Sequence, residues 1–261
     1  MSVDERFVEG AWSLSGRREL FSALAGELES HAARATKWRA RLTLGDEDVF
    51  LKGSPLLGRA ALRHALARAL LGREEPRRAE FANLRWLRAH GFRAPEPCLA
   101  GVRRGGGIAR YQFLVTGWVP APRLDQFLAQ AGPPERAAAL RALGASLARL
   151  HALGFVHRDL FARNLLVEPG PELVYLDAWR GGPARGLRGP LHDLACLMLD
   201  GAQLFTAAEQ RLLFGTYRAQ SPRRLAPDLL RAVARARARL LPRERRRHPE
   251  LAPEWNFLDA E

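Results

Sequence analysis

The sequence predicts an α+β fold with two lobes, a small antiparallel-sheet N-lobe over residues 1–119 and a larger helical C-lobe over residues 120–261. Three observations predict it. Apolar runs paired around glycine-containing turns dominate the first part. Helical periodicity dominates the second part. Pro120 and Pro122 lie between the strand-rich part and the helical part, where a hinge is expected.

The predicted N-lobe contains two strand pairs and one helical stretch. Residues 1–60 are mixed in pattern, with a tight turn at residues 45–47 between the first two strands. Residues 56–90 are helical in pattern and stop at Gly91. The second strand pair flanks the glycines at 105–107. The four predicted strands are Lys37–Leu44, Asp48–Lys52, Leu99–Val102 and Tyr111–Trp118.

The predicted C-lobe begins with a helix over Glu135–Ala152, whose leucines form one stripe. Short apolar runs follow at Phe155–Val156 and Leu165–Val167, and Leu173–Leu176 is predicted as a strand. From Leu191 onward the pattern is helical. Breaks in this last part are expected at Gly201, Pro222, Pro227 and Pro242.

The composition excludes several classes of protein. With 47% hydrophobic and 26% charged residues, the 261-residue chain has the balance of a globular protein. Its two cysteines, Cys98 and Cys196, exclude a disulfide framework and a cysteine-rich zinc site. Residues 1–6 lack the pattern of a signal peptide. The longest uncharged run, Tyr111–Pro122, has 12 residues, whereas a membrane span needs about 20. We therefore expect a cytoplasmic chain.

The net charge of +13 has two interpretations. A bias toward arginine explains it without a function, since Lys37 and Lys52 are the only lysines among 41 basic residues. The functional interpretation is an anionic partner, such as a nucleic acid, a membrane surface or a phosphorylated substrate. Nucleic acid is not expected, because no recognition-helix pattern, zinc-finger spacing or aromatic-ribbon motif is present. A lysine that remains in so arginine-rich a chain is expected to mark a position that arginine cannot fill.

The most specific motif is His157-Arg158-Asp159, with Asn164 five residues after Asp159 and Asp177 at the end of the following strand. Phosphoryl transfer needs a carboxylate that orients the acceptor hydroxyl and takes its proton, and Asp159 is the candidate. Magnesium prefers hard oxygen ligands, which Asn164 and Asp177 would supply. This pattern resembles the catalytic loop and the metal-binding Asp of protein kinases.

Two residues of the predicted N-lobe complete the pattern. Lys52 ends an apolar strand, and Glu80 lies in the helical stretch after it. A cation must bridge the α- and β-phosphates, and a helix carboxylate must hold that cation. Glu74 and Glu75 lie near Glu80 and leave the choice of carboxylate open. The order of these residues resembles the protein-kinase-like superfamily, which implies a bilobal protein-kinase-like fold.

Two further residues have structural interpretations. His157 is expected to brace the segment around Asp177. Asp193 is either an ordinary acid at a helix start or, as the resemblance to kinase-like folds implies, the group that holds the backbone of the catalytic loop.

The phosphate-covering loop departs from the kinase pattern. Protein kinases carry Gly-x-Gly-x-x-Gly in this loop, but the chain has no glycine between Gly26 and Trp38. Backbone amides, aided by Ser30, Arg34 or Thr36, are the alternative ligands for the phosphates.

The spacing after Asp177 disfavours peptide substrates. Ala-Trp follows Asp177 in place of Phe-Gly, 15 residues separate it from Asp193, and no Ala-Pro-Glu is present. The interval is too short for the activation segment of a protein kinase, so a phosphate partner for Arg158 is not expected. The chain resembles the lipopolysaccharide core kinase family (heptose and Kdo kinases and their InaA-type relatives) over about residues 40–220. The resembling pieces are Val49–Lys52, Glu80–Gly91, Phe113–Trp118, His157–Val167, Val174–Arg180, His192–Leu197 and Leu204–Tyr217.

This resemblance implies phosphorylation by Mg²⁺ and ATP of a sugar hydroxyl on the lipopolysaccharide inner core, at the cytoplasmic face of the inner membrane. Asp159 would be the catalytic base, and Asn164 and Asp177 the magnesium ligands. Lys52 and Glu80 would anchor the phosphates. The hinge against adenine would consist of Thr116, Gly117, Trp118 and Val119.

The basic segment at residues 223–247 contains ten arginines and an apolar side. A basic amphipathic helix can lie on an anionic membrane surface, which makes peripheral contact with the inner membrane a hypothesis. The alternative is a helix packed on the C-lobe with a solvated arginine face.

Two rival functions remain open at the level of sequence. A small-molecule phosphotransferase of the aminoglycoside or choline kinase type also has a catalytic Asp, a metal-binding Asp, a short interval after the metal-binding Asp and an Asp-Leu-Ala segment. Acceptor pockets of that type are usually acidic, so the charge of +13 favours an anionic acceptor. A kinase-shaped binding protein without transfer activity is favoured by the missing glycines. The intact set of Lys52, Asp159, Asn164 and Asp177 argues against it.

Overall fold

The computed structural model describes the chain except for residues 1–5, 185, 187, 222–227, 253–254 and 256–261. Expectations that rest on residues 1–5 (no signal peptide), on Pro222 and Pro227 (helix breaks) and on residues 223–227 of the basic segment lie outside the described residues. The chain divides into two compact units, Met1–Pro120 and Ala121–Glu261. In the described residues, no helix is both long enough and apolar enough to cross a bilayer. The α+β fold class is confirmed.

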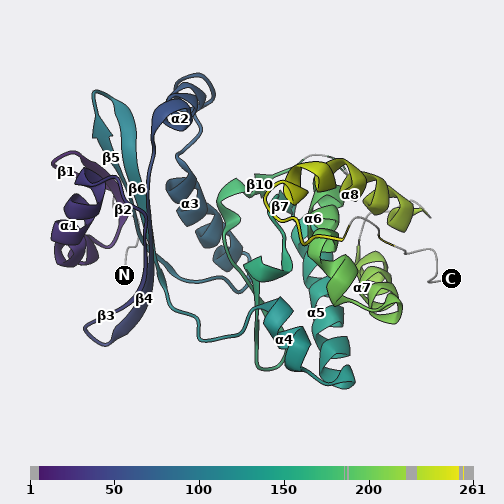
Figure 1. Cartoon of the computed structure of the whole chain (residues 1–261). Coiled ribbons are helices and arrows are strands. Elements are labelled where there is room, and N and C mark those ends of the chain that lie inside the picture. Colours follow the sequence, from purple (N-terminus) through teal and green to yellow (C-terminus); the bar gives the residue numbers. More distant parts are fainter. Residues whose placement is uncertain (1–5, 185, 187, 222–227, 253–254, 256–261) are drawn as a thin grey trace. The chain divides into compact units, whose positions relative to one another are not determined.

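The first unit is built on a six-stranded antiparallel sheet with the strand order β1-β2-β5-β6-β4-β3 (Figure 1). The two predicted strand pairs correspond to the hairpins β3–β4 and β5–β6. The strands are β1 (Arg6–Glu9), β2 (Trp12–Gly16), β3 (Trp38–Leu44), β4 (Glu47–Pro55), β5 (Pro97–Gly105) and β6 (Ile108–Gly117). The helices of this unit are α1 (Arg18–Ala33), α2 (Gly58–Leu71) and α3 (Pro76–Ala89).

Helix α1 and the hairpin β1–β2 lie where the sequence pattern assigns no regular element. The helix packs on one face of the sheet through side chains spaced for a single helical stripe. Its Phe21 meets the edge of Trp12 at 6.0 Å between ring centroids, and Trp12 in turn meets Phe113 at 5.3 Å. These aromatic contacts form the core between α1 and the sheet. The buried stripe of α1 is Leu20, Phe21, Leu24 and Leu28.

The other face of the sheet carries α2 and α3 (Figure 1). The predicted helical stretch of residues 56–90 is two helices, because Gly72 ends α2 in the left-handed conformation, with φ 61°, and Pro76 opens α3. Helix α3 buries one side, and this includes Glu80.

The second unit is mainly helical, and its short strands form two small pairs, β7 with β10 and β8 with β9. The helices are α4 (Leu124–Gln130), α5 (Pro133–Ala152), α6 (Arg188–Leu204), α7 (Ala207–Gln220) and α8 (Leu229–Arg245). The strands are β7 (Phe155–Val156), β8 (Leu165–Glu168), β9 (Glu172–Tyr175) and β10 (Gly182–Pro183). Single 3₁₀ turns lie at Ala162–Asn164 and Ala178–Arg180.

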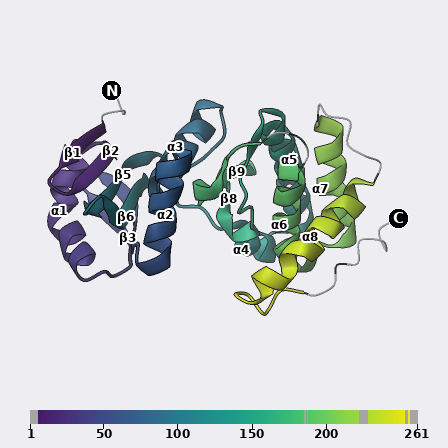
Figure 2. The ribbon, with the colours of Figure 1, turned by 90° about the horizontal axis from the view of Figure 1, so that it is seen from above.

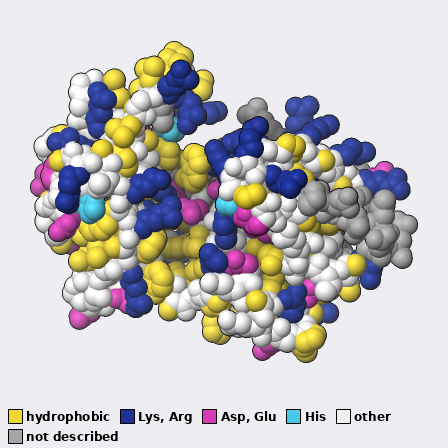
Figure 3. Space-filling view, viewed as in Figure 1, with side chains coloured by type: hydrophobic (Ala, Val, Ile, Leu, Met, Phe, Trp, Pro, Cys, Tyr) yellow, Lys and Arg dark blue, Asp and Glu magenta, His cyan; other side chains and the backbone are white. Residues whose placement is uncertain are grey.

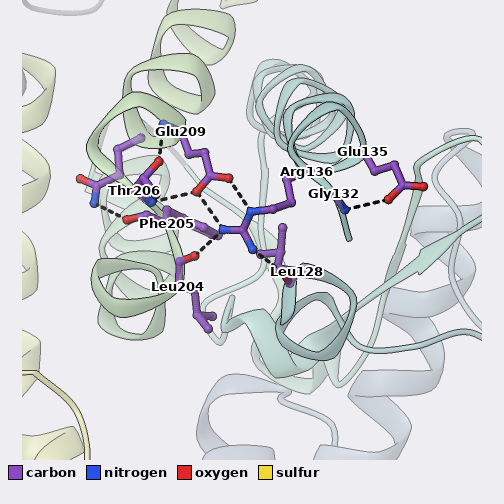
Figure 4. A network of polar contacts seen from close by, with 9 residues as sticks. Leu128, Gly132, Glu135, Arg136, Leu204, Phe205, Thr206 and Glu209 are labelled. Atoms are coloured by element: carbon purple, nitrogen blue, oxygen red, sulfur yellow. Dashed lines mark hydrogen bonds and ion pairs between the residues drawn. The ribbon is translucent and has the colours of Figure 1, made fainter. Parts of the chain in front are cut away.

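Helices α5 and α7 pack closely, and Arg136 joins their ends (Figure 4). Its guanidinium donates to both carboxylate oxygens of Glu209, at 2.6 and 2.8 Å, and to the backbone carbonyls of Leu128 and Leu204. Glu209 also accepts from the amide of Thr206, whose hydroxyl caps α7. The network ties the start of α5 to the end of α4 and to the start of α7.

Helix α8 packs along α6 (Figure 2), and this contact bears on the two interpretations of the basic segment. Leu229, Val233 and Leu241 are buried, so the apolar side of the described part of this segment lies in the protein core. Arg231, Arg235 and Arg239 are exposed, as the packed alternative predicts, whereas Arg237 is buried and donates to the carbonyl of Met198 at 2.8 Å. The expected break at Pro242 is wrong, because the helix continues through it while its neighbour Leu241 stays anchored in the core.

The expected break at Gly201 is also wrong, because Gly201 lies within α6. A Cβ atom at this position would come within 2.5 Å of the Phe205 ring. The glycine therefore permits a close contact and does not end the helix.

Candidate active site

In the first unit, Lys52 and Glu80 form a buried ion pair. The Lys52 ammonium donates to Oε1 of Glu80 at 2.6 Å, and Arg77 donates to Oε2 at 2.5 Å. Only 1% of the Glu80 side chain and 11% of the Lys52 side chain are exposed. A carboxylate that accepts from two cations in a buried site fixes the ammonium in one place.

The neighbouring carboxylates have other partners. Glu75 is buried and binds Arg104 at 2.5 Å, and Glu74 binds Arg78 at 3.2 Å. Of the three acids that the sequence offers, Glu80 is therefore the one that contacts Lys52.

The strand register places Lys52 on the face of the sheet opposite to α1. Directly across from it on β3 is Arg39, so both side chains project from the same face. Arg39 is exposed, and in the described part of the chain its side chain makes no ion pair or hydrogen bond. Sequence reasoning missed Arg39, because the predicted turn at residues 45–47 places Ala40 opposite Lys52. In the structure Leu44 pairs with Glu47, and this shift of one residue brings Arg39 opposite Lys52.

The predicted hinge lies at the end of β6. Thr116 is buried and sits opposite Phe50, on the same face as Lys52. The Gly117 amide donates to the carbonyl of Glu96, and the Trp118 amide to that of Asp48. Within the described residues the Val119 amide makes no hydrogen bond. It is thus the hinge amide that remains able to donate to a ligand.

The segment expected to cover the phosphates is largely helical. Residues 26–33 are the last part of α1, which packs on the face of the sheet away from Lys52. Ser30 and Arg34 bond each other at 2.7 Å, and Thr36 bonds His31 at 2.7 Å. A loop over Gly26–Trp38 is therefore contradicted, because a continuous apolar stripe draws most of the segment into α1.

In the second unit, Asp193 holds the backbone of the catalytic loop. Its carboxylate is fully buried within α6 and accepts from the amides of His157 and Arg158 at 2.6 and 2.7 Å, and from His151 at 3.2 Å. Burial alone would raise the pKa of Asp193, but the hydrogen bond and charge of His151 and the other contacts hold the pKa below its ordinary value. Of the two interpretations of Asp193, the structure therefore shows the one in which its carboxylate holds the backbone at His157 and Arg158.

His157 and Arg158 brace the segment around Asp177. The His157 Nε2 atom lies 2.8 Å from the carbonyl of Leu176, which precedes Asp177. The Arg158 guanidinium donates to the carbonyls of Arg180 and Pro183 at 3.0 and 2.8 Å. Arg158 and Asp177 both have left-handed backbones, with φ 59° and 53°. Such strain persists where surrounding contacts over-determine the conformation, and it clusters at active sites.

Asp159 and Asn164 meet within the catalytic loop. The Asn164 side-chain amide donates to the backbone carbonyl of Asp159 at 2.8 Å, which leaves its oxygen as the available ligand atom. Burial raises the pKa of Asp159, while the positive charges of His157 and Arg180 oppose the rise. The nearby charge of Asp177 adds to it, so the two carboxylates share one electrostatic environment.

The donor set fits magnesium by its chemistry. Leu176 donates its amide to the Asn164 carbonyl at 2.9 Å, which ties the strand before Asp177 to the catalytic loop. One amide oxygen and one carboxylate suit an ion that keeps several waters and phosphate oxygens among its ligands. No cluster of three or more His, Cys, Asp or Glu side chains that could hold a metal occurs among the described residues.

Comparison with known proteins gives one family. A family model described as the lipopolysaccharide kinase (Kdo/WaaP) family matches residues 58–209, more than half of the chain. This range includes Glu80, Asp159, Asn164 and Asp177 and begins after Lys52. No curated protein matches the sequence.

Solved structures are similar at low identity. A crystal structure of WbdD has 19% identity and a TM-score of 0.46, covering 73% of this chain and 46% of its own. A second, of the bifunctional kinase-methyltransferase WbdD, has 18% identity and a TM-score of 0.45, covering 89% and 53%. A divergent Toxoplasma kinase that lacks the glycine-rich loop and regulates membrane ultrastructure of the parasitophorous vacuole has 13% identity and a TM-score of 0.38, covering 85% and 79%. The chain spans about half the length of the two WbdD chains.

Proposed function

The chain belongs to the lipopolysaccharide kinase (Kdo/WaaP) family, and from this premise we propose that it transfers the terminal phosphate of Mg·ATP to a hydroxyl of an anionic sugar of the lipopolysaccharide inner core. The observation that carries the proposal is the buried ion pair of Lys52 and Glu80. A buried carboxylate that fixes an ammonium is what a phosphate anchor requires, because phosphoryl transfer depends on positioning and charge neutralisation.

The first unit would hold the nucleotide. Lys52 would bind the α- and β-phosphates, with Glu80 fixing its position. Arg39, on the same face and next to Lys52, would add a second phosphate contact in place of the amides of a glycine-rich loop. Val119 would donate its free amide to adenine, between Thr116 and the exposed ring of Trp118.

The second unit would carry the chemistry. Asp159 would accept the proton of the acceptor hydroxyl, and the raised pKa that burial gives it makes it a stronger base than an exposed Asp. Asn164 and Asp177 would hold magnesium, which when bound neutralises charge on the phosphates. Asp193 would keep the loop in place through the amides of His157 and Arg158.

The contacts of Arg158 support an enzyme that needs no phosphorylated loop. In kinases that are switched by phosphorylation, a phosphate orders the activation loop through arginine contacts. Here the guanidinium is satisfied by the carbonyls of Arg180 and Pro183, inside the short segment after Asp177. We therefore expect transfer activity without prior modification.

The proposal is tested by the fate of the labelled terminal phosphate of Mg·ATP. The acceptors are unphosphorylated core lipopolysaccharide, an aminoglycoside mixture and a generic protein. Label in the lipopolysaccharide alone is the expected result. Label in the aminoglycosides would instead support the small-molecule rival. ATP binding without transfer to any acceptor would support the binding-protein rival.

A further inference from the structure

Helix α2 exposes its leucines and packs on the sheet through alanine, the reverse of an ordinary surface helix. Leu62, Leu66 and Leu70 recur every four residues and are 64%, 56% and 71% exposed. Helix α2 packs on the sheet through Ala61, which contacts Val102 in a small apolar cluster. The three leucines therefore form one exposed stripe on the side of α2 that does not contact the sheet.

The ends of the helix extend this apolar surface. Leu57, which precedes α2, is 55% exposed, and Leu71 at its last position is 64% exposed. We call these five leucines the leucine stripe of α2. They make up most of the large hydrophobic side chains that are exposed in the described chain, so this surface is concentrated and not scattered.

Arginines surround the leucine stripe, and no acid interrupts it. Residues 57–73 contain Arg59, Arg63, Arg68 and Arg73 and neither Asp nor Glu. All four arginines are exposed. Figure 3 shows hydrophobic and basic side chains side by side over α2 at the top of the view. Of the first acids that follow, Glu74 pairs with Arg78, and Glu75 pairs with Arg104 and, at 3.8 Å, with Arg68 of α2. Arg59, Arg63 and Arg73 are therefore the arginines that the proposal below uses.

We propose that α2 docks on an anionic lipid surface, with the leucine stripe in the interfacial region and the arginines against the lipid phosphates. A helix with an apolar stripe between basic residues lies in the plane of the interface, and its affinity combines apolar burial with electrostatic attraction. A second protein chain would need matching acidic groups around an apolar groove, whereas an anionic bilayer offers both features along its whole surface.

Helix α8 provides the internal contrast. It exposes Arg231, Arg235 and Arg239, but Leu229, Val233 and Leu241 are buried in the second unit, and no leucine of α8 is fully exposed. The exposed surface of α8 is thus basic, whereas the exposed surface of α2 is both basic and apolar. The hypothesis of membrane contact by residues 223–247 is separate from this proposal, and the test below distinguishes the two.

Vesicle sedimentation of the full chain tests the proposal. The vesicles are phosphatidylcholine alone, or phosphatidylcholine mixed with the anionic phosphatidylglycerol. The chain is expected to sediment with the mixed vesicles only. The double variant Leu66→Gln with Leu70→Gln should lower the affinity at least about tenfold, because less apolar surface leaves water on binding. Arg59→Gln with Arg63→Gln should lower it by roughly fivefold per arginine.

Two control variants make the test specific. Leu153→Gln removes an exposed leucine of the second unit, and Arg235→Gln with Arg239→Gln removes exposed charge from α8. Both should bind vesicles as the unmodified chain does. Circular dichroism checks that every variant is folded. The leucine variant reduces apolar burial in the membrane, and the arginine variant reduces electrostatic attraction to the anionic lipid. If one of the two variants fails to fold, the other still tests the proposal.

Three outcomes would overturn the proposal. The leucine and arginine variants of α2 could bind as tightly as the unmodified chain, or binding could depend on the α8 arginines instead. Sedimentation velocity could also show a dimer that the leucine variant dissociates, with no vesicle binding, in which case a second copy covers α2. None of these readouts involves ATP, so the proposal fails or stands separately from the proposed function.

Discussion

Arg39 and Lys52 lie directly opposite each other on β3 and β4 and project from the same face of the sheet, the face away from α1. Lys52 is held by Glu80, whereas Arg39 is exposed. A cation that is free to engage a ligand thus stands beside a cation that is fixed. Under the proposed function, these two cations would contact the phosphates in place of a glycine-rich loop.

Replacing Arg39 by alanine should weaken ATP binding about tenfold, since a charge-assisted hydrogen bond contributes about 1.5–3 kcal/mol. Adenosine should bind Arg39→Ala and the unmodified chain equally well. The matched control is Arg41→Ala, two residues along the same face, because Arg41 is already paired with Asp48. Calorimetry with both ligands measures the effect. Equal loss of ATP and adenosine affinity would place Arg39 away from the phosphates.

Glu80→Gln should lower the free energy of unfolding by about 3 kcal/mol, because it removes the buried negative charge that Lys52 and Arg77 share. The control is Asp48→Asn, which breaks the exposed pair with Arg41 and should cost less than about 1 kcal/mol. Urea unfolding measures both. Similar costs for the two variants would mean that the buried pair has no special energetic role.

Asp193→Asn should disturb the catalytic loop. The carboxylate accepts from two backbone amides, and the amide group of Asn can accept through its oxygen only, so one buried N–H loses its acceptor. The expected cost is about 1–3 kcal/mol of stability, together with a fall in kcat at unchanged ATP affinity. Stability and kcat equal to those of the unmodified chain would show that the loop holds its shape without Asp193.

Asp200 should make stability depend on pH. Burial raises the pKa of Asp200 to about 6, although it accepts the amide of Ala162 and lies near Arg163. An acid whose pKa is raised on folding stabilises the protein below its unfolded pKa, near 4, and this contribution is lost as the pH rises through 6. Asp200→Asn should therefore gain on the order of 2 kcal/mol over the unmodified chain between pH 4 and pH 7. A gain that is independent of pH would contradict the shift.

The sequence predicted well those parts of the fold that depend on local pattern. The hairpin before Lys52 and the helix before the catalytic loop follow from alternation, turns and helical spacing. Helix α1 carries a readable stripe as well, but Gly26 in its middle and its arginine-rich start weaken the signal. The orientation of α8 could not be predicted, since an amphipathic helix fits a protein core and a membrane surface equally well.

The candidate site also divides into residues that the local sequence predicted and residues that only tertiary packing revealed. Motif spacing identified Asp159, Asn164 and Asp177, and their roles stay predictions. The choice of Glu80 over its neighbours required the face of α3, which tertiary packing decides. Arg39 required strand register, and the exposure of the α2 leucines required knowledge of which side the sheet covers. Such facts depend on contacts between distant segments and leave only a weak local trace.

The most direct test of the account is the turnover of Asp159→Asn with Mg·ATP and unphosphorylated core lipopolysaccharide. If Asp159 takes the proton of the acceptor hydroxyl, kcat should fall by roughly 10²- to 10⁴-fold, while the Kd for ATP stays unchanged. Turnover equal to that of the unmodified chain would contradict the assignment of Asp159 as the base, and with it the proposed mechanism of transfer.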